Sequence, residues 1–159
     1  MKNLSIKKAR LKDIKFLFNL YNTSIIEKYS KTRKLIHYID HKNWFLKNVN
    51  SEKNKIYIIY QNKIKIGYIR INIFESRSCF ISIYLKMKKR SKNLGSICIN
   101  KMLLIAKNKF NIKNVYAEVL KKNIFSKFFF KKNKFKFIKY LKKFNSIFDK
   151  KNYIFLRKI

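Results

Sequence analysis

The sequence predicts a mixed α/β (α+β) fold, in which a central sheet of about seven strands is flanked by about four helices. Runs of β-branched and aromatic residues alternate along the chain with segments whose apolar residues recur at helical spacing. The length of 159 residues, of which 47% are hydrophobic, suits one domain with a buried core. We therefore expect residues 1–159 to form a single domain.

The N-terminal third is expected to hold one strand and two helices. Residues 3–9 have the composition of a strand. Residues 11–29 carry apolar side chains at helical spacing, which predicts a helix. Residues 40–49 predict a second, shorter helix with Asp40 as its N-cap, because Asp accepts hydrogen bonds from the open first turn.

Three strands are expected next, at residues 55–61, 64–74 and 79–87. Asn62-Lys63 separates the first two β-branched runs and predicts a hairpin turn. Gly67 lies inside the second run, where a glycine indicates either a bulge or a close approach of another backbone.

The C-terminal part returns to alternating helices and strands. From Asn93 the apolar residues follow one helical face. Residues 112–120 predict a strand and residues 123–133 a short helix. Residues 134–140 and 150–159 predict the last two strands. The expected order is strand, two helices, three strands, helix, strand, helix and two strands.

The formal net charge of +34 points to anionic partners. A small nucleic-acid-binding protein is one interpretation, although the sequence has no recognisable RNA-binding signature. The other is composition bias: Lys, Asn, Ile, Phe and Tyr dominate, Pro is absent and Gly occurs twice, as an AT-rich genome would produce. The lysines are spread along the whole chain, which favours the bias. Either way, we expect nonspecific attraction of polyanions.

No segment reaches the roughly 18 apolar residues of a membrane span, and the N-terminus lacks a signal-peptide pattern. We therefore expect a cytoplasmic protein without a membrane partner. Cys79 and Cys98 belong to no CxxC pair, and His37 and His41 lie far from both in sequence, so no metal site is expected. The two cysteines are expected to be buried apolar residues.

The junction between a strand and a helix at Arg90 to Ser96 is a candidate anion site. The start of a helix offers unpaired N–H groups and the positive end of its dipole. Arg90 and Lys92 add charge, Gly95 leaves the backbone accessible, and Asn93 tolerates a left-handed conformation. The alternative is an ordinary turn in a lysine-rich protein.

Residues 90–96 also resemble the acetyl-CoA-binding segment of the GNAT N-acetyltransferases, Arg/Gln-x-x-Gly-x-Gly/Ala, with Asn93 in place of the first glycine. The stretch "YAEVLKKNIFSKFFFKKNKFKF" resembles a second motif of that family, with Lys134 where Gly is usual. The residues in step with it are Glu118, Val119, Asn123, Ser126, Phe130, Lys132 and Phe135. On these two motifs and the order of elements, the chain is identified as a member of the family.

The resemblance implies acetyl-CoA as co-substrate and assigns its binding residues. The backbone of residues 83–85 would pair with the pantetheine arm, the N–H groups of residues 91–96 would hold the pyrophosphate, and Phe130 would pack near the thiol. The complete implied set is Ile83, Tyr84, Leu85, Arg90, Ser91, Lys92, Asn93, Leu94, Gly95, Ser96, Asn123 and Phe130.

Acetyl transfer requires a base for the amine and a proton for the leaving thiolate. Glu118, at the end of a strand, is the first candidate base and Glu75 the second; the alternative for Glu118 is a solvated or ion-paired carboxylate. Many relatives carry Tyr where this chain has Phe130, which cannot donate a proton. Water, Tyr84, unaided departure beside Lys or Arg, or lost activity are the alternatives.

The stretch His41 to Phe45 resembles the H-x-x-W-F segment of a GNAT subgroup that acts on amino groups of nucleotide-linked sugars. It implies that Trp44 stacks on the acceptor and that His41 makes a polar contact. The alternative is that Trp44 and Phe45 pack in the core and His41 is exposed. A small-molecule amine is the favoured acceptor. Protein amines, and an inactive CoA-binding fold, remain open.

Overall fold

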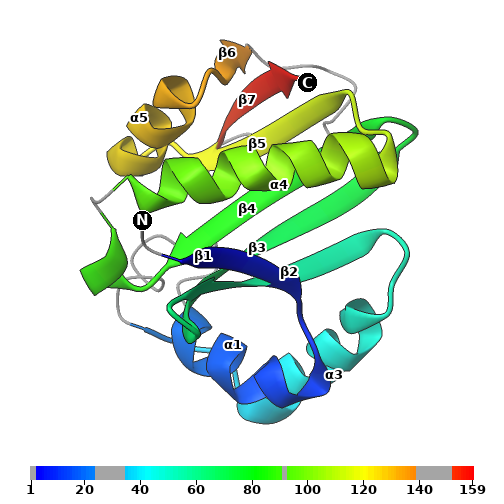
Figure 1. Ribbon diagram of the computed structural model, residues 1–159, viewed down its shortest axis with the longest axis vertical. Coiled ribbons are helices and arrows are strands. Elements are labelled where there is room, and N and C mark those ends of the chain that lie inside the picture. The colour runs from blue at the N-terminus through cyan, green and yellow to red at the C-terminus, as the bar shows by residue number, and fades with distance from the viewer. Residues whose placement is uncertain (1–2, 24–34, 91–92, 139–151) are drawn as a thin grey trace.

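The computed structural model describes residues 3–23, 35–90, 93–138 and 152–159. They form a seven-stranded sheet with helices on both faces, as predicted, in the order β1-β2-β3-β4-β5-β7-β6 (Figure 1). The strands are β1 (Leu4–Lys8), β2 (Asn54–Gln61), β3 (Ile64–Glu75), β4 (Ser78–Leu85), β5 (Asn114–Leu120), β6 (Lys136–Ile138) and β7 (Asn152–Lys158). The described helices are α1 (Ile14–Tyr21), α3 (Tyr38–Val49), α4 (Leu94–Phe110) and α5 (Ile124–Lys132), with short 3-10 turns at Leu11–Asp13 and Met87–Lys89.

The two faces of the sheet hold different cores because successive strand residues point to opposite sides. On β2, Ile59 belongs to the main core, which α4 and α5 cover. Ile56 and Ile58 belong to a second core, which is formed with α1 and α3. Cys79 and Cys98 are buried in the main core as predicted, and burial raises the pKa of their thiols to about 12 and about 11. Both thiols therefore remain protonated and unreactive at neutral pH.

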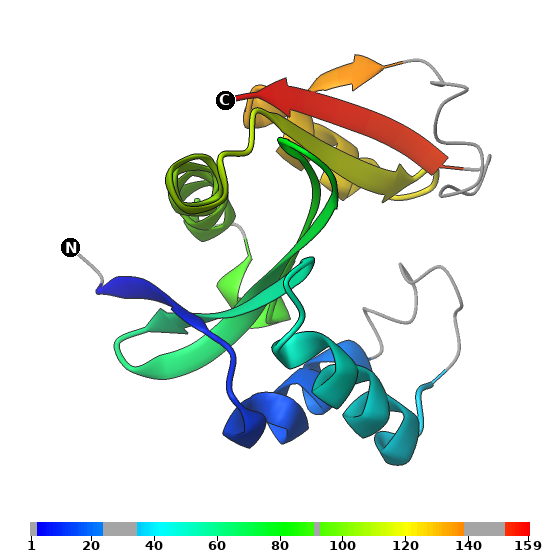
Figure 2. The same ribbon diagram turned by 90° about the vertical axis from the view of Figure 1, so that its right-hand side faces the viewer.

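The sheet divides near its centre, between β4 and β5. These strands are parallel, and their pairing covers only Ser78–Phe80 against Asn114–Tyr116. Beyond those pairs, β4 continues to Leu85 paired with β3, and β5 continues to Leu120 paired with β7. Figure 2 shows the two strands together at one end and apart at the other. We call the opening between Ile81–Leu85 and Ala117–Leu120 the split.

The hairpin between β2 and β3 has the turn that the sequence predicts. Asn62 and Lys63 have φ values of 48° and 66°, and positive φ at both central residues is typical of a type I′ turn. The prediction of a bulge or close approach at Gly67 is also confirmed. Gly67 pairs with Ile59, and the register of the two strands shifts between Ile59 and Tyr60. A Cβ placed on Gly67 would lie 2.1 Å from the Tyr84 carbonyl oxygen, so no side chain fits there.

Helix boundaries differ from the predictions at two places. The helix expected over residues 11–29 begins as a 3-10 turn and α1 ends at Tyr21, whereas residues 24–29 lie outside the described part. Asn22 ends it: its side-chain amide donates to the Ile36 carbonyl (2.8 Å) and its Oδ1 accepts from the Ile36 N–H (3.1 Å). The second helix, α3, begins at Tyr38 with His37 as N-cap. Asp40 is therefore not the N-cap but lies in the first turn, where its charge suits the helix dipole.

The remaining predicted elements are confirmed within a few residues at their ends. Of the last two predicted strands, residues 139–140 and 150–151 lie outside the described part. Among the described helices, none combines the length and the apolar character needed to cross a membrane.

Candidate active site

The edge of β4 that borders the split presents backbone groups of alternate residues. The Lys86 N–H donates to the Ile66 carbonyl on β3 (2.8 Å), so even-numbered residues of β4 direct their N–H and C=O toward β3. Ile83 and Leu85 consequently direct theirs toward the split. The Leu85 carbonyl accepts a hydrogen bond from Nε of Arg90 (3.0 Å), which agrees with this direction.

The N-terminus of α4 lies just after β4 in the chain and carries the open N–H groups that the sequence predicts. The first α-helical hydrogen bond runs from the Ile97 N–H to the Asn93 carbonyl, so the N–H groups of Leu94, Gly95 and Ser96 precede the regular ladder. Asn93 has a φ of 57°, which is the left-handed conformation expected of it. Ser91 and Lys92 lie outside the described residues.

Gly95 has a packing reason for being a glycine. Its φ is not positive, and a Cβ there would lie 2.9 Å from Cε2 of Phe129 and 3.6 Å from Cδ1 of Leu85. The first turn of α4 therefore packs closely against α5 and the end of β4. Close packing accounts for this glycine without a ligand, and the predicted contact of Gly95 with a pyrophosphate stays a prediction.

Asn123 and Phe130 lie at the two ends of α5. Asn123 is the N-cap, and its Oδ1 accepts from the Ser126 N–H at 3.0 Å. Phe130 is buried in the main core, with its ring centre 5.0 Å from that of Phe135. The side-chain oxygen of Asn123 therefore caps α5, while its side-chain NH2 group takes no part in this cap. Phe130 packs in the core.

Glu118 lies on β5 beyond the last residue that pairs with β4, so it borders the split. Its neighbours Ala117 and Val119 belong to the main core, which places Glu118 on the face opposite α4 and α5. Oε1 of Glu118 accepts from Nδ2 of buried Asn152 at 2.7 Å, which fixes the carboxylate. Glu75 is at the other end, where β3 turns into β4 and β4 is still paired with β5.

A pocket of about 450 Å³ opens on this same face, between α1, α3 and the strands β2 and β3. Trp44 and His41 of α3 line one side, and Tyr68 and Arg70 of β3 line another. The Arg70 guanidinium carbon lies 5.8 Å from the centre of the Trp44 ring, a cation–π contact. The remaining lining residues are Leu17, Tyr21, Leu35, Ile36, Asp40 and Ile56.

The structure brings His41 and Trp44 together, with ring centres 5.5 Å apart. The alternative, in which Trp44 and Phe45 pack in the core and His41 is exposed, is wrong for two of the three residues. His41 is 4% exposed, whereas Trp44 is 37% exposed; only Phe45 is buried as expected. His41, Phe45 and Val49 form the buried stripe of α3, four residues apart, and this stripe faces the second core. Burial lowers the pKa of His41, so the imidazole is neutral at pH 7.

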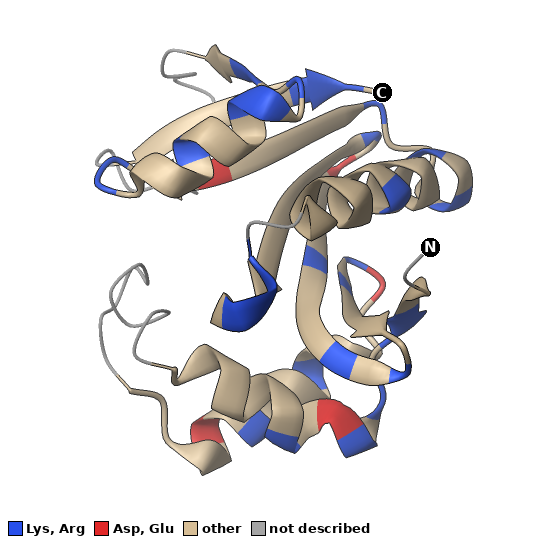
Figure 3. Cartoon of the chain, turned by 60° about the vertical axis from the view of Figure 1, so that its left-hand side comes forward, with Lys and Arg blue, Asp and Glu red and all other residues tan. Residues whose placement is uncertain are grey.

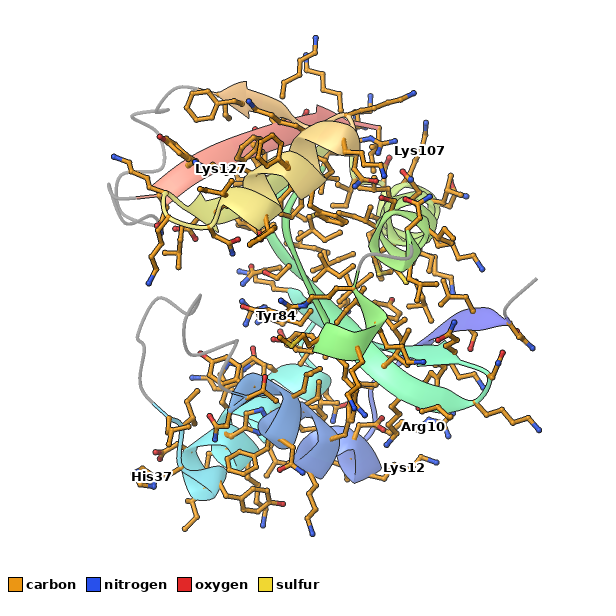
Figure 4. All side chains as sticks on the ribbon, turned by 90° about the vertical axis from the view of Figure 1, so that its left-hand side faces the viewer. Arg10, Lys12, His37, Tyr84, Lys107 and Lys127 are labelled. Carbon is orange, nitrogen blue, oxygen red and sulfur yellow. The ribbon has the colours of Figure 1, made fainter. Side chains whose placement is uncertain are left out.

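Tyr84 lies near the middle of the molecule, between the helices α1 and α3 and the part formed by β5, β7 and α5 (Figure 4). Its ring stacks on Tyr68 with centres 4.9 Å apart. Burial raises the pKa of Tyr84, against the opposing effect of Arg70 and Arg90, and burial together with Tyr84 raises the pKa of Tyr68 well above its usual value. Both phenols are therefore protonated at neutral pH and can donate a proton or a hydrogen bond.

Sequence reasoning missed Arg70, Tyr68 and Tyr21 as residues of the site. A signal for the first two was present: Tyr68, Arg70 and Asn72 alternate with isoleucines along β3, so they share one face of a strand that is otherwise apolar. Within the described part of the chain, no group of three or more His, Cys, Asp or Glu side chains gathers where a metal ion could bind.

Comparison with solved structures shows the fold. A domain from Methanocaldococcus jannaschii DSM 2661 is similar with a TM-score of 0.84 and 19% identity over all of both chains. Campylobacter jejuni N-acetyltransferase PseH, in complex with acetyl coenzyme A, has a TM-score of 0.73 and 19% identity over 98% of this chain and 99% of that one. A variant of the spermidine N-acetyltransferase SpeG from Vibrio cholerae has a TM-score of 0.79 and 16% identity over 98% and 93%.

No curated protein sequence matches the chain significantly. The sequence profile of the acetyltransferase (GNAT) family, however, matches residues 14–135, from the start of α1 to Phe135 of the second motif. That range covers most of the chain and includes the split, the α4 N-terminus and the pocket residues of β3. The chain belongs to the acetyltransferase (GNAT) family.

Proposed function

We propose that the protein transfers an acetyl group from acetyl-CoA directly to a primary amine, and that the acceptor is a nucleotide-linked amino sugar. The observation that carries the first part is the split between β4 and β5, where the backbone groups of Ile83 and the N–H of Leu85 face away from β3, close to a helix N-terminus. A pantetheine arm contains amides that can pair with such an edge as an added strand does.

The residues at the split fit acetyl-CoA. Ile83 and Leu85 direct backbone groups toward it, and the N–H groups at the start of α4 suit a pyrophosphate. Arg90 is anchored to the Leu85 carbonyl, which holds a positive charge close to the same place. Bound there, acetyl-CoA supplies an activated thioester, and the Ile83 N–H is suited to polarise its carbonyl.

Glu118 is the base in this proposal. It borders the split on the face that also carries the pocket, and its hydrogen bond from Asn152 orients it. It takes a proton from the acceptor ammonium, so that the nitrogen forms a bond to the acetyl carbon as the C–S bond breaks. Tyr84 is the proposed acid, since it is protonated and Phe130 carries no hydroxyl. It gives its proton to the thiolate, and the second proton that the nitrogen loses as it becomes an amide restores the phenol.

The pocket is the proposed acceptor site because it is concave and has aromatic walls, which favours a small molecule over a protein chain. Trp44 offers a half-exposed ring face for a sugar or base, and the resemblance of residues 41–45 to the sugar-acting subgroup supports the same class. The spermidine N-acetyltransferase among the similar structures indicates how widely acceptors differ on this fold.

Binding of the co-substrate is the first test. Acetyl-CoA should raise the melting temperature by mass action, by an amount that grows with its concentration. Inorganic polyphosphate at equal phosphate concentration is the control for simple charge neutralisation. A shift from acetyl-CoA that does not exceed the shift from polyphosphate would contradict the proposal.

Turnover is the second test, measured as thiol release from acetyl-CoA with a panel of amines. Glu118→Gln should lower kcat by about 10²–10⁴-fold while CoA binding is unchanged, because the carboxylate acts in proton transfer. Glu75→Gln removes the same charge at the closed end of the split and should leave kcat unchanged. Equal kcat in both variants and wild type would remove Glu118 as the base.

A further inference from the structure

The acceptor pocket contains a charged group with no ionic partner among the described residues. Lys65, two strand positions away from Gly67 on β3, pairs with buried Asp13 at 2.6 Å. Arg70, which is half-buried, instead contacts the Trp44 ring. An arginine in a concave aromatic site is well suited to a bidentate pair with a phosphate or carboxylate.

His41 supplies a second, independent sign that the pocket takes a ligand. The side chain is 4% exposed, and its Nδ1 is buried without a hydrogen-bond partner in the described structure. An unpaired buried polar atom is costly, and a ligand that reaches it recovers that cost. Because the imidazole lines the pocket, a hydroxyl or N–H group of an occupant can pair with it.

The charges around the pocket decide between classes of amine. Asp40 is the one carboxylate among the described lining residues, and it is exposed, so water and salt screen it. Arg70 lies deeper, and the molecule as a whole carries a formal charge of +34. A polyamine, which is a multiple cation, is repelled by this field, whereas an anionic acceptor is drawn in.

We propose that Arg70 determines the acceptor specificity of this pocket: its guanidinium pairs with a phosphate of the acceptor, whose ring lies on Trp44, so that phosphate-bearing amines bind and polyamines are excluded. This inference rests on the proposed function of the pocket as the acceptor site. What is new is that Arg70 selects the acceptor and that the group it recognises is negatively charged.

The chain provides its own probe, because Trp44 is its single tryptophan and lines the pocket. Tryptophan emission is titrated with UDP, uridine, pyrophosphate and spermidine, on protein saturated with CoA so that the CoA site is occupied. UDP should change the emission saturably and bind about tenfold or more tightly than uridine, because its phosphates reach Arg70. Spermidine binding more tightly than UDP, or uridine binding as tightly as UDP, would overturn the proposal.

Variants distinguish a direct contact between Arg70 and the ligand from the general attraction of anions by the positive charge of the protein. Arg70→Met should weaken UDP binding by about tenfold or more, whereas Lys47→Met, an exposed residue of α3 outside the pocket, changes net charge equally and should have little effect. Arg70→Lys should fall between wild type and Arg70→Met, because the ammonium keeps the charge without the fork. Equal losses in Arg70→Met and Lys47→Met would overturn the assignment.

A second variant and the binding of CoA are also measured. If Arg70→Met does not fold, Asp40→Asn replaces it: removing an exposed negative charge should leave UDP affinity equal or higher, and a loss would overturn the proposal. CoA binding by thermal shift is recorded for every variant and should not change. Wild-type protein that fails to bind CoA contradicts the proposed function, while the UDP titration, then run without CoA, still decides the role of Arg70.

Discussion

Two backbone positions show what this glycine-poor sequence does where the family commonly has glycine. Asn93 and Lys134 both adopt left-handed φ values, 57° and 62°. The conformation required by the fold is therefore kept although the residue differs. Asn tolerates that conformation through its short polar side chain, whereas Lys has no such advantage.

Lys134 is consequently a strained position, and we expect Lys134→Gly to stabilise the protein. Removing the Cβ relieves a left-handed strain of about 1–2 kcal/mol, partly offset by the greater freedom of glycine in the unfolded chain. The expected gain of about 1 kcal/mol corresponds to a rise in Tm of about 2–4 °C. Lys134→Ala keeps the Cβ and serves as the control; equal Tm values for the two variants would contradict the strain.

His41 makes stability depend on pH in a definite direction. Its pKa in the folded protein is lower than the ordinary 6.5, so the unfolded chain binds the proton more tightly. The stability that this residue contributes is present above pH 6.5 and is lost as pH falls through its folded pKa. Thermal unfolding from pH 7.5 to pH 5 should show a falling Tm, with a smaller fall in His41→Gln. An identical slope in that variant would mean that other groups cause it.

Among single residues, those set by a repeating pattern were predictable and those set by a distant neighbour were not. Phe45 and the two cysteines lie in the core because their apolar side chains continue a helical or strand pattern. His41 continues the four-residue spacing of Phe45 and Val49, so a local pattern contained its burial, whereas the half-exposed ring of Trp44 depends on how α3 faces β2 and β3. Arg70 belongs to the site because the fold places β3 beside α3, and this arrangement could not be predicted from the sequence around Arg70.

At the scale of elements, local sequence was enough to predict the strands and helices. A predicted helix end was wrong where a side chain forms hydrogen bonds to a residue distant in sequence. Asn22 ends α1 through a contact with Ile36, fourteen positions later. The pairing of β4 with β5, and its end after three residue pairs, joins segments on either side of α4. The motif at the α4 N-terminus could therefore be found from sequence, but the split that makes it a site could not.

The split leads to an expectation for individual amides of β4. Binding of CoA should slow hydrogen exchange at Ile83 and Leu85, whose N–H groups face the split, while Tyr84, whose N–H faces β3, should change little. Exchange of β4 amides is measured with and without CoA by NMR. Equal protection of all three residues would indicate general rigidification and contradict added-strand binding.

For the molecule as a whole, positive charge is dispersed: Figure 3 shows Lys and Arg on helices and strands throughout the described chain, with few Asp and Glu. In this view the described Lys and Arg residues do not gather on one element, as composition bias predicts. The charge still creates a real field around the protein, and that field acts on any anion.

Salt therefore distinguishes general attraction from a specific site. Nonspecific DNA binding that involves six to ten phosphates should weaken by about 10³–10⁵-fold between about 50 and 200 mM salt. Acetyl-CoA affinity should fall far less, since backbone pairing adds to its few charges. Parallel titrations with a DNA duplex and acetyl-CoA over this range make the comparison. DNA binding that persists as strongly as CoA binding would favour a nucleic-acid function.

The direction of the Ile83 and Leu85 backbone groups has one more consequence, for how the sequence can change. A ligand held through main-chain N–H and C=O groups places little demand on which side chains those positions carry. Only a residue that removes the N–H would abolish such a contact, and that residue is proline, which the chain lacks entirely. A binding edge of this kind therefore tolerates a change of side chain at Ile83 and Leu85, provided that neither residue becomes proline.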